Sequence, residues 1–424
     1  MPRSDISPVW HPFTQHALFP HAVEIARGEG AYLVTGEGRR ILDAISSWWV
    51  VTHGHCHPQI IAAIRAQAER LDQVIFAGFT HQPAEDLARG LIAIAPPGLA
   101  HVFYSDSGST SVEVAVKMAL GYWRNIGAPR SRLLVLEHGY HGDTVGGMSL
   151  GARGIYNAPY EPLLFDVSTL PFPHAGKEQA TLDALEVACG AREGKPAALL
   201  AEPLILGAGG MLTYAPPVLR EMKQICEAND VLFIADEVMT GWGRTGTLFA
   251  CEQAGITPDI LCLAKGLTGG SMPLAATLCT APIFEAHLSK DRARTFFHSS
   301  SFTANPIACA AALANLKVWE DEPVRANLAR IAAAHEAHLA GFRGDERFSA
   351  VRRSGTIAAL DLKVTDSGYL AEVGPRLYEF FIAQDLLIRP LGNTIYLMPP
   401  YCVSDDDLAR LYGAIEEAAG LVAG

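Results

Sequence analysis

The sequence predicts an α/β protein with one large, mostly parallel sheet domain and a smaller α+β domain. Between about residues 50 and 320, short apolar runs alternate with longer stretches of helical periodicity, and turns with Gly or Asp follow the runs. Later the pattern changes to an amphipathic helix, strands and a final helix. We therefore expect an N-terminal segment that joins the small domain (1–45), a large domain (46–318) and a C-terminal small domain (319–424).

Five apolar runs in the first part of the chain predict buried strands, because continuous apolar stretches of this length are typical of strands covered on both faces. They are His101–Tyr104, Arg132–Leu136, Ala197–Ala201, Val231–Ala235 and Ile260–Ala264. Ligands of parallel sheets bind beyond the carboxyl ends of the strands. The polar residues at those ends are therefore the first candidates for a site: Ser105–Ser109, Glu137–Thr144, Glu202, Asp236, Glu237 and Lys265.

The remaining segments predict the elements of the small domain. A hairpin is expected around Gly36–Arg40, where turn residues separate two apolar runs. The amphipathic stretch Val324–Ala340 predicts a helix, Gly355–Leu362 and Thr394–Met398 predict strands, and a last helix is expected to begin at Asp405.

Composition limits the classes of function. The chain has 424 residues, of which 49% are hydrophobic and 18% are charged, so it can bury a large core. Its net charge of -12 argues against nucleic acid or anionic lipid as a partner. We expect no export signal and no membrane span, because the apolar stretches are shorter than the roughly 20 residues that a span needs. Eight scattered cysteines without a C-x-x-C pair favour a reducing cytoplasm.

Two charged residues at neighbouring strand ends suggest the chemistry. Asp236 follows one predicted strand and Lys265 follows the next, so both are expected at the same rim of the sheet. Such a pair suits a pyridinium aldehyde, because the carboxylate keeps the ring nitrogen protonated while the amine binds the aldehyde. The alternative is a surface lysine and an aspartate that caps a helix.

Two loops could complete a site for such a cofactor. Tyr104–Thr110 lies between a strand and a helical pattern, and its small residues could place backbone N–H groups around a phosphate; an ordinary helix N-cap is the alternative. Gly266–Gly270 offers a similar signal, which is equally weak when taken alone. In His138–Thr144, Tyr140 is the candidate to stack on a flat ring. Its alternative is a half-buried loop tyrosine.

A cluster of histidines, His53, His55 and His57, could bind a metal ion, since imidazole is a common zinc ligand. Gly54 and Pro58 favour a turn that leads into a helix instead. We therefore predict no metal site, and a metal-dependent hydrolase remains a distant alternative.

Several motifs together resemble one enzyme family. They are Asp236–Val238, Thr240–Gly246 and Lys265–Gly266. This combination resembles the class III branch of the fold-type-I aminotransferases, which depend on pyridoxal 5′-phosphate. Further segments resemble those members that convert 8-amino-7-oxononanoate into 7,8-diaminononanoate in biotin biosynthesis, with S-adenosylmethionine as amino donor: Trp10–Thr14, Ser46–Trp49, Tyr140–Thr144, Pro258–Leu263, Arg389–Pro390 and Tyr396–Tyr401.

The resemblance implies a role for each candidate residue. Lys265 would bind the cofactor as a Schiff base, and Asp236 would pair with its ring nitrogen. Tyr140 would stack on the ring, while Gly108 and Ser109 would hold the phosphate. A homodimer is implied, because the family takes a phosphate-binding hydroxyl from the second subunit. The position of that hydroxyl matches Ser301, preceded by Ser299 and Ser300. Trp48 would wall the substrate channel, and Arg389 would bind the carboxylate of the keto acid.

Three positions depart from the family pattern. Phe13 stands where many relatives have Tyr, Ser299–Ser301 replaces Gly-Pro-Thr, and Leu206 replaces Gln. Phe13 also resembles relatives that use lysine as amino donor, so lysine is the alternative donor. Another class III ω-aminotransferase, acting on ornithine or 4-aminobutyrate, is the alternative enzyme.

Overall fold

The computed structural model describes residues 7–19, 21–365 and 367–423. Its largest element is a seven-stranded sheet, whose strands follow the order β4-β12-β11-β10-β7-β5-β6. The strands are β4 (Leu99–Ser105), β5 (Leu133–Leu136), β6 (Ser168–Leu170), β7 (Ala198–Ala201), β10 (Leu232–Asp236), β11 (Ile260–Leu263) and β12 (Ala275–Thr280). Strand β12 runs antiparallel to both of its neighbours, whereas the pairs from β11 to β6 are parallel. The predicted mostly parallel sheet is confirmed.

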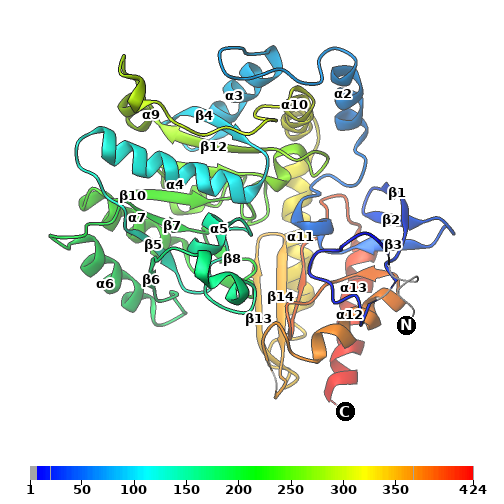
Figure 1. Ribbon diagram of the computed structural model, residues 1–424. Coiled ribbons are helices and arrows are strands. Elements are labelled where there is room, and N and C mark those ends of the chain that lie inside the picture. Colours follow the sequence, from blue (N-terminus) through cyan, green and yellow to red (C-terminus); the bar gives the residue numbers. More distant parts are fainter. Residues whose placement is uncertain (1–6, 20, 366, 424) are drawn as a thin grey trace.

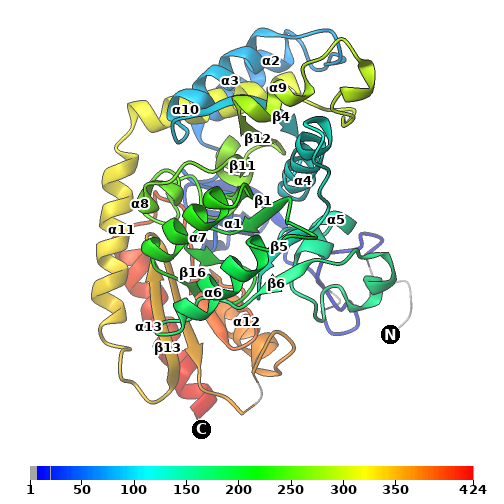
Figure 2. The same ribbon diagram turned by 90° about the vertical axis from the view of Figure 1, so that its left-hand side faces the viewer.

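Helices cover both faces of this sheet (Figures 1 and 2). Alternate residues of β5 show why two layers are needed: Leu134 and Leu136 pack into one apolar cluster, and Leu133 and Val135 into another. The helices of this part of the chain are α2 (Pro58–Ala68), α3 (Gln82–Ile94), α4 (Gly108–Asn125), α5 (Val145–Leu150), α6 (Glu178–Cys189), α7 (Pro216–Ala228), α8 (Cys251–Ala254), α9 (Ala281–His287) and α10 (Pro306–Asp321).

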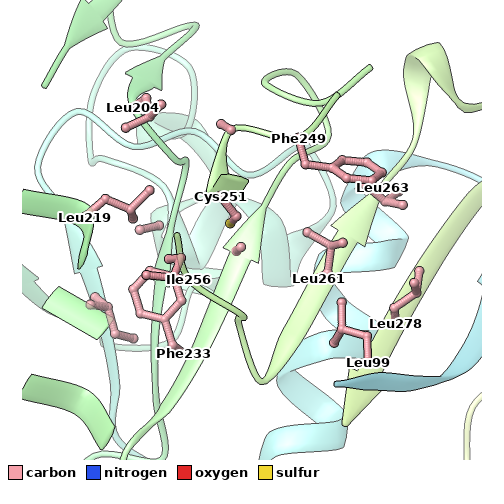
Figure 3. Packing of buried hydrophobic residues seen from close by; sticks show 14 of the residues in the cluster. Leu99, Leu204, Leu219, Phe233, Phe249, Cys251, Ile256, Leu261, Leu263 and Leu278 are labelled. Atoms are coloured by element: carbon pink, nitrogen blue, oxygen red, sulfur yellow. The ribbon is translucent and has the colours of Figure 1, made fainter. Parts of the chain in front are cut away.

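The larger apolar cluster lies on the face that α3, α6, α7 and α10 cover. Figure 3 shows part of it, with Phe233, Leu261 and Leu278 from three adjacent strands; Leu278 lies beside Leu99 of the next strand, and Phe233 lies beside Ile256. Each of these side chains is almost fully buried. Burial of one such side chain contributes about 1.5–3 kcal/mol, so this layer fixes the strand ends that face the site.

A second group of elements packs beside the large sheet. Its sheets are β1-β2-β3-β15 and β13-β14-β16, with strands β1 (Ile25–Glu29), β2 (Tyr32–Thr35), β3 (Arg40–Asp43), β13 (Phe348–Ser354), β14 (Ile357–Leu362), β15 (Leu386–Leu387) and β16 (Thr394–Leu397). Its helices are α11 (Val324–Leu339), α12 (Val373–Ala383) and α13 (Asp405–Ala423). The predicted hairpin, the two strands and both helices are confirmed. Short elements complete the chain: α1 (Ser46–Trp49), β8 (Ile205–Leu206), β9 (Leu212–Thr213), and the 3-10 helices η2 (Ala158–Leu163), η3 (Lys265–Thr268) and η4 (Arg292–Arg294).

Strands from the N-terminal and C-terminal parts of the chain meet in this second group. Strand β3 pairs in parallel with β15, so that Leu42 lies opposite Leu386, and both side chains belong to one apolar cluster. Figure 1 shows β1–β3 next to α13. This packing supports our proposed division into 1–45, 46–318 and 319–424. No helix within the described ranges is long and apolar enough to cross a membrane.

Candidate active site

Asp236 and Lys265 lie at the same rim of the large sheet. Asp236 is the last residue of β10, and Lys265 follows β11 by two positions. The two strands are parallel neighbours, with Asp236 opposite Cys262. Both residues line one cavity of about 460 Å³. Their juxtaposition is the one that the sequence predicted.

The backbone and surroundings of Lys265 are unusual. Its φ of 47° lies in the left-handed region, which costs a residue other than glycine about 1–3 kcal/mol. Its Nζ lies 4.5 Å from the ring centroid of Trp49. Burial lowers the pKa of the Lys265 amine to about 8, although the charges of Asp236 and Glu202 oppose the change. The amine is therefore partly neutral near physiological pH and able to act as a nucleophile or base.

The Asp236 carboxylate is held in one orientation. Its Oδ2 lies 2.7 Å from Nδ1 of His141, and its Oδ1 accepts a hydrogen bond from the backbone N–H of Val238 at 3.1 Å. Both Asp236 and His141 are buried. His141 was not among the predicted site residues, although it stands next to Tyr140 in the loop His138–Thr144.

Glu202 brings a second buried carboxyl group close to Lys265. It accepts hydrogen bonds from the backbone N–H groups of Tyr140 and Gly207, at 3.1 and 3.0 Å. Burial raises the pKa of this carboxyl to about 7. Burial also raises the pKa of the Tyr140 phenol, so that this cavity-lining hydroxyl stays protonated. Glu202 therefore anchors the loop that carries Tyr140.

The N-terminus of α4 opens into the cavity. Ser107 caps the helix by accepting from the N–H of Thr110, and Gly108 and Ser109 form its first turn. First-turn N–H groups have no partner within the helix and attract anions. The loop of Gly142 packs tightly here, because a Cβ on Gly142 would come within 1.7 Å of Ser109 Oγ.

Aromatic side chains and one cation form another wall of the cavity. The ring centroids of Phe13 and Trp48 are 5.7 Å apart, and Tyr156 lies edge-on to Phe13 at 6.0 Å. The Arg389 guanidinium lies 5.6 Å from the Trp48 ring and donates to the carbonyl of Phe13 at 3.0 Å. Within the described part of the chain, Arg389 has no carboxylate partner, so its charge is available to a ligand.

The sequence of the chain matches that of a known family of enzymes. The family model described as aminotransferase class III matches residues 14–419. The chain belongs to the class III aminotransferase family. It is 46% identical to the adenosylmethionine-8-amino-7-oxononanoate aminotransferase of Synechococcus elongatus, over 96% of this chain and 97% of that protein. It is 39% identical to the same-named protein of Geobacter sulfurreducens, over 98% and 96% of the two chains.

Solved structures of aminotransferases have the same fold. The adenosylmethionine-8-amino-7-oxononanoate aminotransferase of Methanocaldococcus jannaschii superposes with a TM-score of 0.93 at 34% identity, covering 98% of this chain and 97% of that one. An amine transaminase from an uncultivated Pseudomonas species, in its PLP-bound form, gives a TM-score of 0.92, also at 34% identity, with 98% and 99% coverage. The predicted fold and reaction class are confirmed.

The residues of this class III aminotransferase fit pyridoxal 5′-phosphate, the cofactor of its family. A partly buried amine with a lowered pKa at Lys265 suits the aldehyde, and a buried carboxylate at Asp236 suits a protonated ring nitrogen. The N-terminus of α4 suits the phosphate. Space at that terminus depends on glycine, because a Cβ on Gly108 would come within 2.6 Å of Val238 Cγ1.

The predicted site residues separate into two groups. Those that line the cavity are Phe13, Trp48, Gly108, Ser109, Tyr140, Asp236, Lys265 and Arg389. Ser299, Ser300 and Ser301 are not among its lining residues. Ser300 donates its backbone N–H to Thr303, and the carbonyl of Ser301 accepts from Gln73. The role that the resemblance gives these serines belongs to a second copy of the chain and stays a prediction.

The three histidines that suggested a metal have different partners. His53 lies 2.9 Å from Asn315 Oδ1, His55 lies 2.8 Å from Asp43 Oδ2, and His57 pairs with Glu322 at 3.1 Å. In the residues that the structure describes, no group of three or more His, Cys, Asp or Glu side chains could hold a metal ion.

Proposed function

We propose that this class III aminotransferase converts 8-amino-7-oxononanoate into 7,8-diaminononanoate, with S-adenosylmethionine as the amino donor. The observation that supports this most directly is a single cavity that contains Lys265, an aromatic wall and Arg389. An aliphatic acid with a ketone near one end suits such a cavity, because its chain can lie on the rings while its carboxylate pairs with the guanidinium. The names of the relatives support the same substrates.

In the proposed reaction, Lys265 both binds the cofactor and moves the proton. The cofactor, when bound, supplies an aldehyde that condenses with amines and a ring that accepts electrons. Lys265 Nζ would take the proton from the α-carbon of the donor and deliver it to the carbon that the cofactor's aldehyde provides, two atoms away, which a lowered pKa favours. Asp236, oriented by His141, would keep the ring nitrogen protonated. Tyr140 would cover the ring, and Gly108 and Ser109 would hold the phosphate.

The substrate contacts are assigned to Phe13, Trp48 and Arg389. The rings of Phe13 and Trp48 exclude water from the aliphatic chain, and Arg389 pairs with the carboxylate. Lysine is the second candidate donor, because Phe13 offers no hydroxyl to this wall. Which amine serves is decided by the test below.

We also propose that the active enzyme is a homodimer. Large apolar side chains flank the serine segment on both sides, with Phe297 70% and Phe302 60% exposed. Exposed apolar groups of this size favour a protein partner. The second copy would then supply Ser299, Ser300 and Ser301 to the cofactor phosphate.

The free state of all eight cysteines supports a reducing, cytoplasmic location.

The experiment that tests the function follows the visible absorbance of the bound cofactor in the purified protein. S-adenosylmethionine should move the absorbance to shorter wavelength, and 8-amino-7-oxononanoate should then restore it while 7,8-diaminononanoate forms. Conversion by lysine alone would make lysine the donor. Lys265→Ala should abolish both halves of the reaction. Full turnover in that variant, or restoration by ornithine-derived aldehydes alone, would contradict the proposal.

A further inference from the structure

The segment that carries both cavity tryptophans has a strained backbone. Ser46, Ser47 and Trp49 have φ angles of 54°, 58° and 66°. Each such residue other than glycine costs about 1–3 kcal/mol and persists only where its surroundings fix it. Trp48 and Trp49 both line the cavity. Some group must therefore hold this segment in place.

The carboxylate of Asp43 is such a group. Its Oδ1 accepts from the backbone N–H groups of Ser47 at 2.8 Å and Ile45 at 3.3 Å. Its Oδ2 accepts from the Ser47 hydroxyl at 3.1 Å and lies 2.8 Å from His55 Nε2. Asp43 is fully buried and does not line the cavity. All four contacts therefore bind the carboxylate to the protein itself.

His55 connects Asp43 to the N-terminal hairpin. Its backbone N–H donates to the carbonyl of Gly30 at 2.7 Å. Its side chain lies so close to Gly28 that a Cβ there would come within 2.7 Å of His55 Cβ. Asp43 is itself the last residue of β3, and its N–H donates to Ala31. Strands β1–β3 thus support the strained segment through Asp43 and His55.

The two tryptophans make different contacts within the site. Trp48 lies against Phe13 and the Arg389 guanidinium, at ring distances of 5.7 and 5.6 Å. Trp49 lies 4.5 Å from Lys265 Nζ, and its Nε1 donates to the hydroxyl of Tyr396 at 2.9 Å. A shift of the segment would move Trp48 more easily than Trp49, because Trp49 is buried and hydrogen-bonded whereas Trp48 is half exposed.

We infer that Asp43 is a positioning residue of the active site, which fixes Trp48 against Arg389 through the strained segment. Its function is to shape the end of the cavity that binds the carboxylate of the long substrate. The identity of that substrate rests on the proposed function, whereas the link from Asp43 to Trp48 does not.

The test compares the Asp43→Asn variant with the wild-type enzyme, both with cofactor bound. The amide keeps the shape of the side chain but replaces one accepting oxygen by a donor, which conflicts with Ser47 and His55. We expect the KM for 8-amino-7-oxononanoate to rise about tenfold or more, as for small displacements of substrate-positioning groups. The kcat should change much less. The near-ultraviolet circular dichroism of the tryptophans should change as well, which requires no substrate.

A double variant separates positioning from a loss of stability. If Asp43 acts through Trp48 on Arg389, Asp43→Asn should add little to the KM of an Arg389→Ala enzyme, because the two effects are coupled. Additive effects would overturn the inference.

His55→Gln keeps a hydrogen-bond donor for Asp43. It should therefore restore most of the affinity for the keto acid that His55→Ala loses.

Asp259→Asn is the matched control. Asp259 accepts from the N–H of Phe233 at 2.7 Å and pairs with Lys223, at the opposite end of β11 from Lys265. This variant should lower the melting temperature without changing the KM or the tryptophan signal. An Asp43→Asn protein that behaves like Asp259→Asn would overturn the inference. If the unchanged enzyme does not act on the keto acid, the proposed function fails, and the circular dichroism comparison still tests Asp43.

Discussion

At the scale of single residues, burial determines the chemistry of the site. Asp236 and Glu202 are buried and Lys265 is partly buried, and their ionisable groups lie close enough to influence one another. The sequence placed the amine and the carboxylate correctly, because residues at the ends of adjacent parallel strands must share a rim. It could not place His141 on Asp236, because that contact depends on how a loop folds back over the rim.

The rate of cofactor binding should depend on pH through the protonation of the Lys265 amine. The folded protein lowers the pKa of this amine from 10.5 to about 8, so half of it is in the neutral, reactive form near pH 8 and most of it at higher pH. The rate at which cofactor-free protein binds pyridoxal 5′-phosphate should therefore rise with pH, with a midpoint near pH 8, and level off at higher pH. Rapid-mixing absorbance measurements check this profile.

Asp236→Asn provides the control for this titration. The charge of Asp236 raises the pKa of Lys265, so its removal should move the midpoint of the profile to lower pH. A midpoint near 10 in the unchanged protein would show that the amine behaves as an ordinary lysine.

Arg389→Ala should weaken binding of the keto acid by about 2–5 kcal/mol, since it removes the partner of a desolvated carboxylate. The KM of the second half-reaction measures this loss, while the donor half-reaction provides an internal comparison. Arg389→Lys should recover only part of the affinity, because lysine cannot form the bidentate hydrogen bonds that arginine makes with a carboxylate. Unchanged affinity in the alanine variant would place the carboxylate elsewhere.

At the scale of elements, the start of α4 is built from small residues for a steric reason. Gly142 has a φ of 109°, and its missing Cβ leaves room for Ser109. Gly142→Ala should lower the affinity for the cofactor about tenfold or more, because the new methyl group would displace Ser109 at the start of α4, where the phosphate is expected to bind. A cofactor titration of the cofactor-free protein measures this change.

Gly127→Ala is the matched control for Gly142→Ala. Gly127 also has a positive φ, of 83°, but no atom lies within 4 Å of the position of its Cβ. Both variants therefore place an alanine at a positive φ, which strains the backbone, and only Gly142→Ala also brings the new Cβ into contact with Ser109. Equal cofactor affinities would mean that the packing against Ser109 has no effect on phosphate binding.

The elements themselves were predictable to different degrees. The strands that became β5, β7 and β10 are continuous apolar runs, and periodicity alone finds them. Strand β12 was missed because Ala275–Thr280 is rich in small residues and runs antiparallel, which a simple β-α-β alternation does not predict. The strained turn Ser46–Trp49 was also beyond prediction, since a contact from the distant Arg244 to the carbonyl of Trp49 helps to fix it.

At the scale of the whole molecule, the proposed dimer makes each site depend on two chains. Hybrid dimers of Lys265→Ala and Ser301→Trp chains should regain activity, because one of their two sites would combine an intact Lys265 with an intact Ser301. Activity measured after mixing and refolding, with each variant alone as control, checks this. If the mixture stays as inactive as its parents, the site does not need the partner's serine.

The cavity also collects residues from nearly the whole length of the chain. Phe13, Lys265 and Tyr396 all line it, and strand β3 near the N-terminus pairs with β15 near the C-terminus. During synthesis, β3 can pair with β2 at once but must wait for its second neighbour, β15, until about nine-tenths of the chain has left the ribosome. A truncated product that ends before β15 lacks a wall of the active site. Incomplete synthesis of this enzyme should thus yield inert chains rather than fragments with uncontrolled aminotransferase activity.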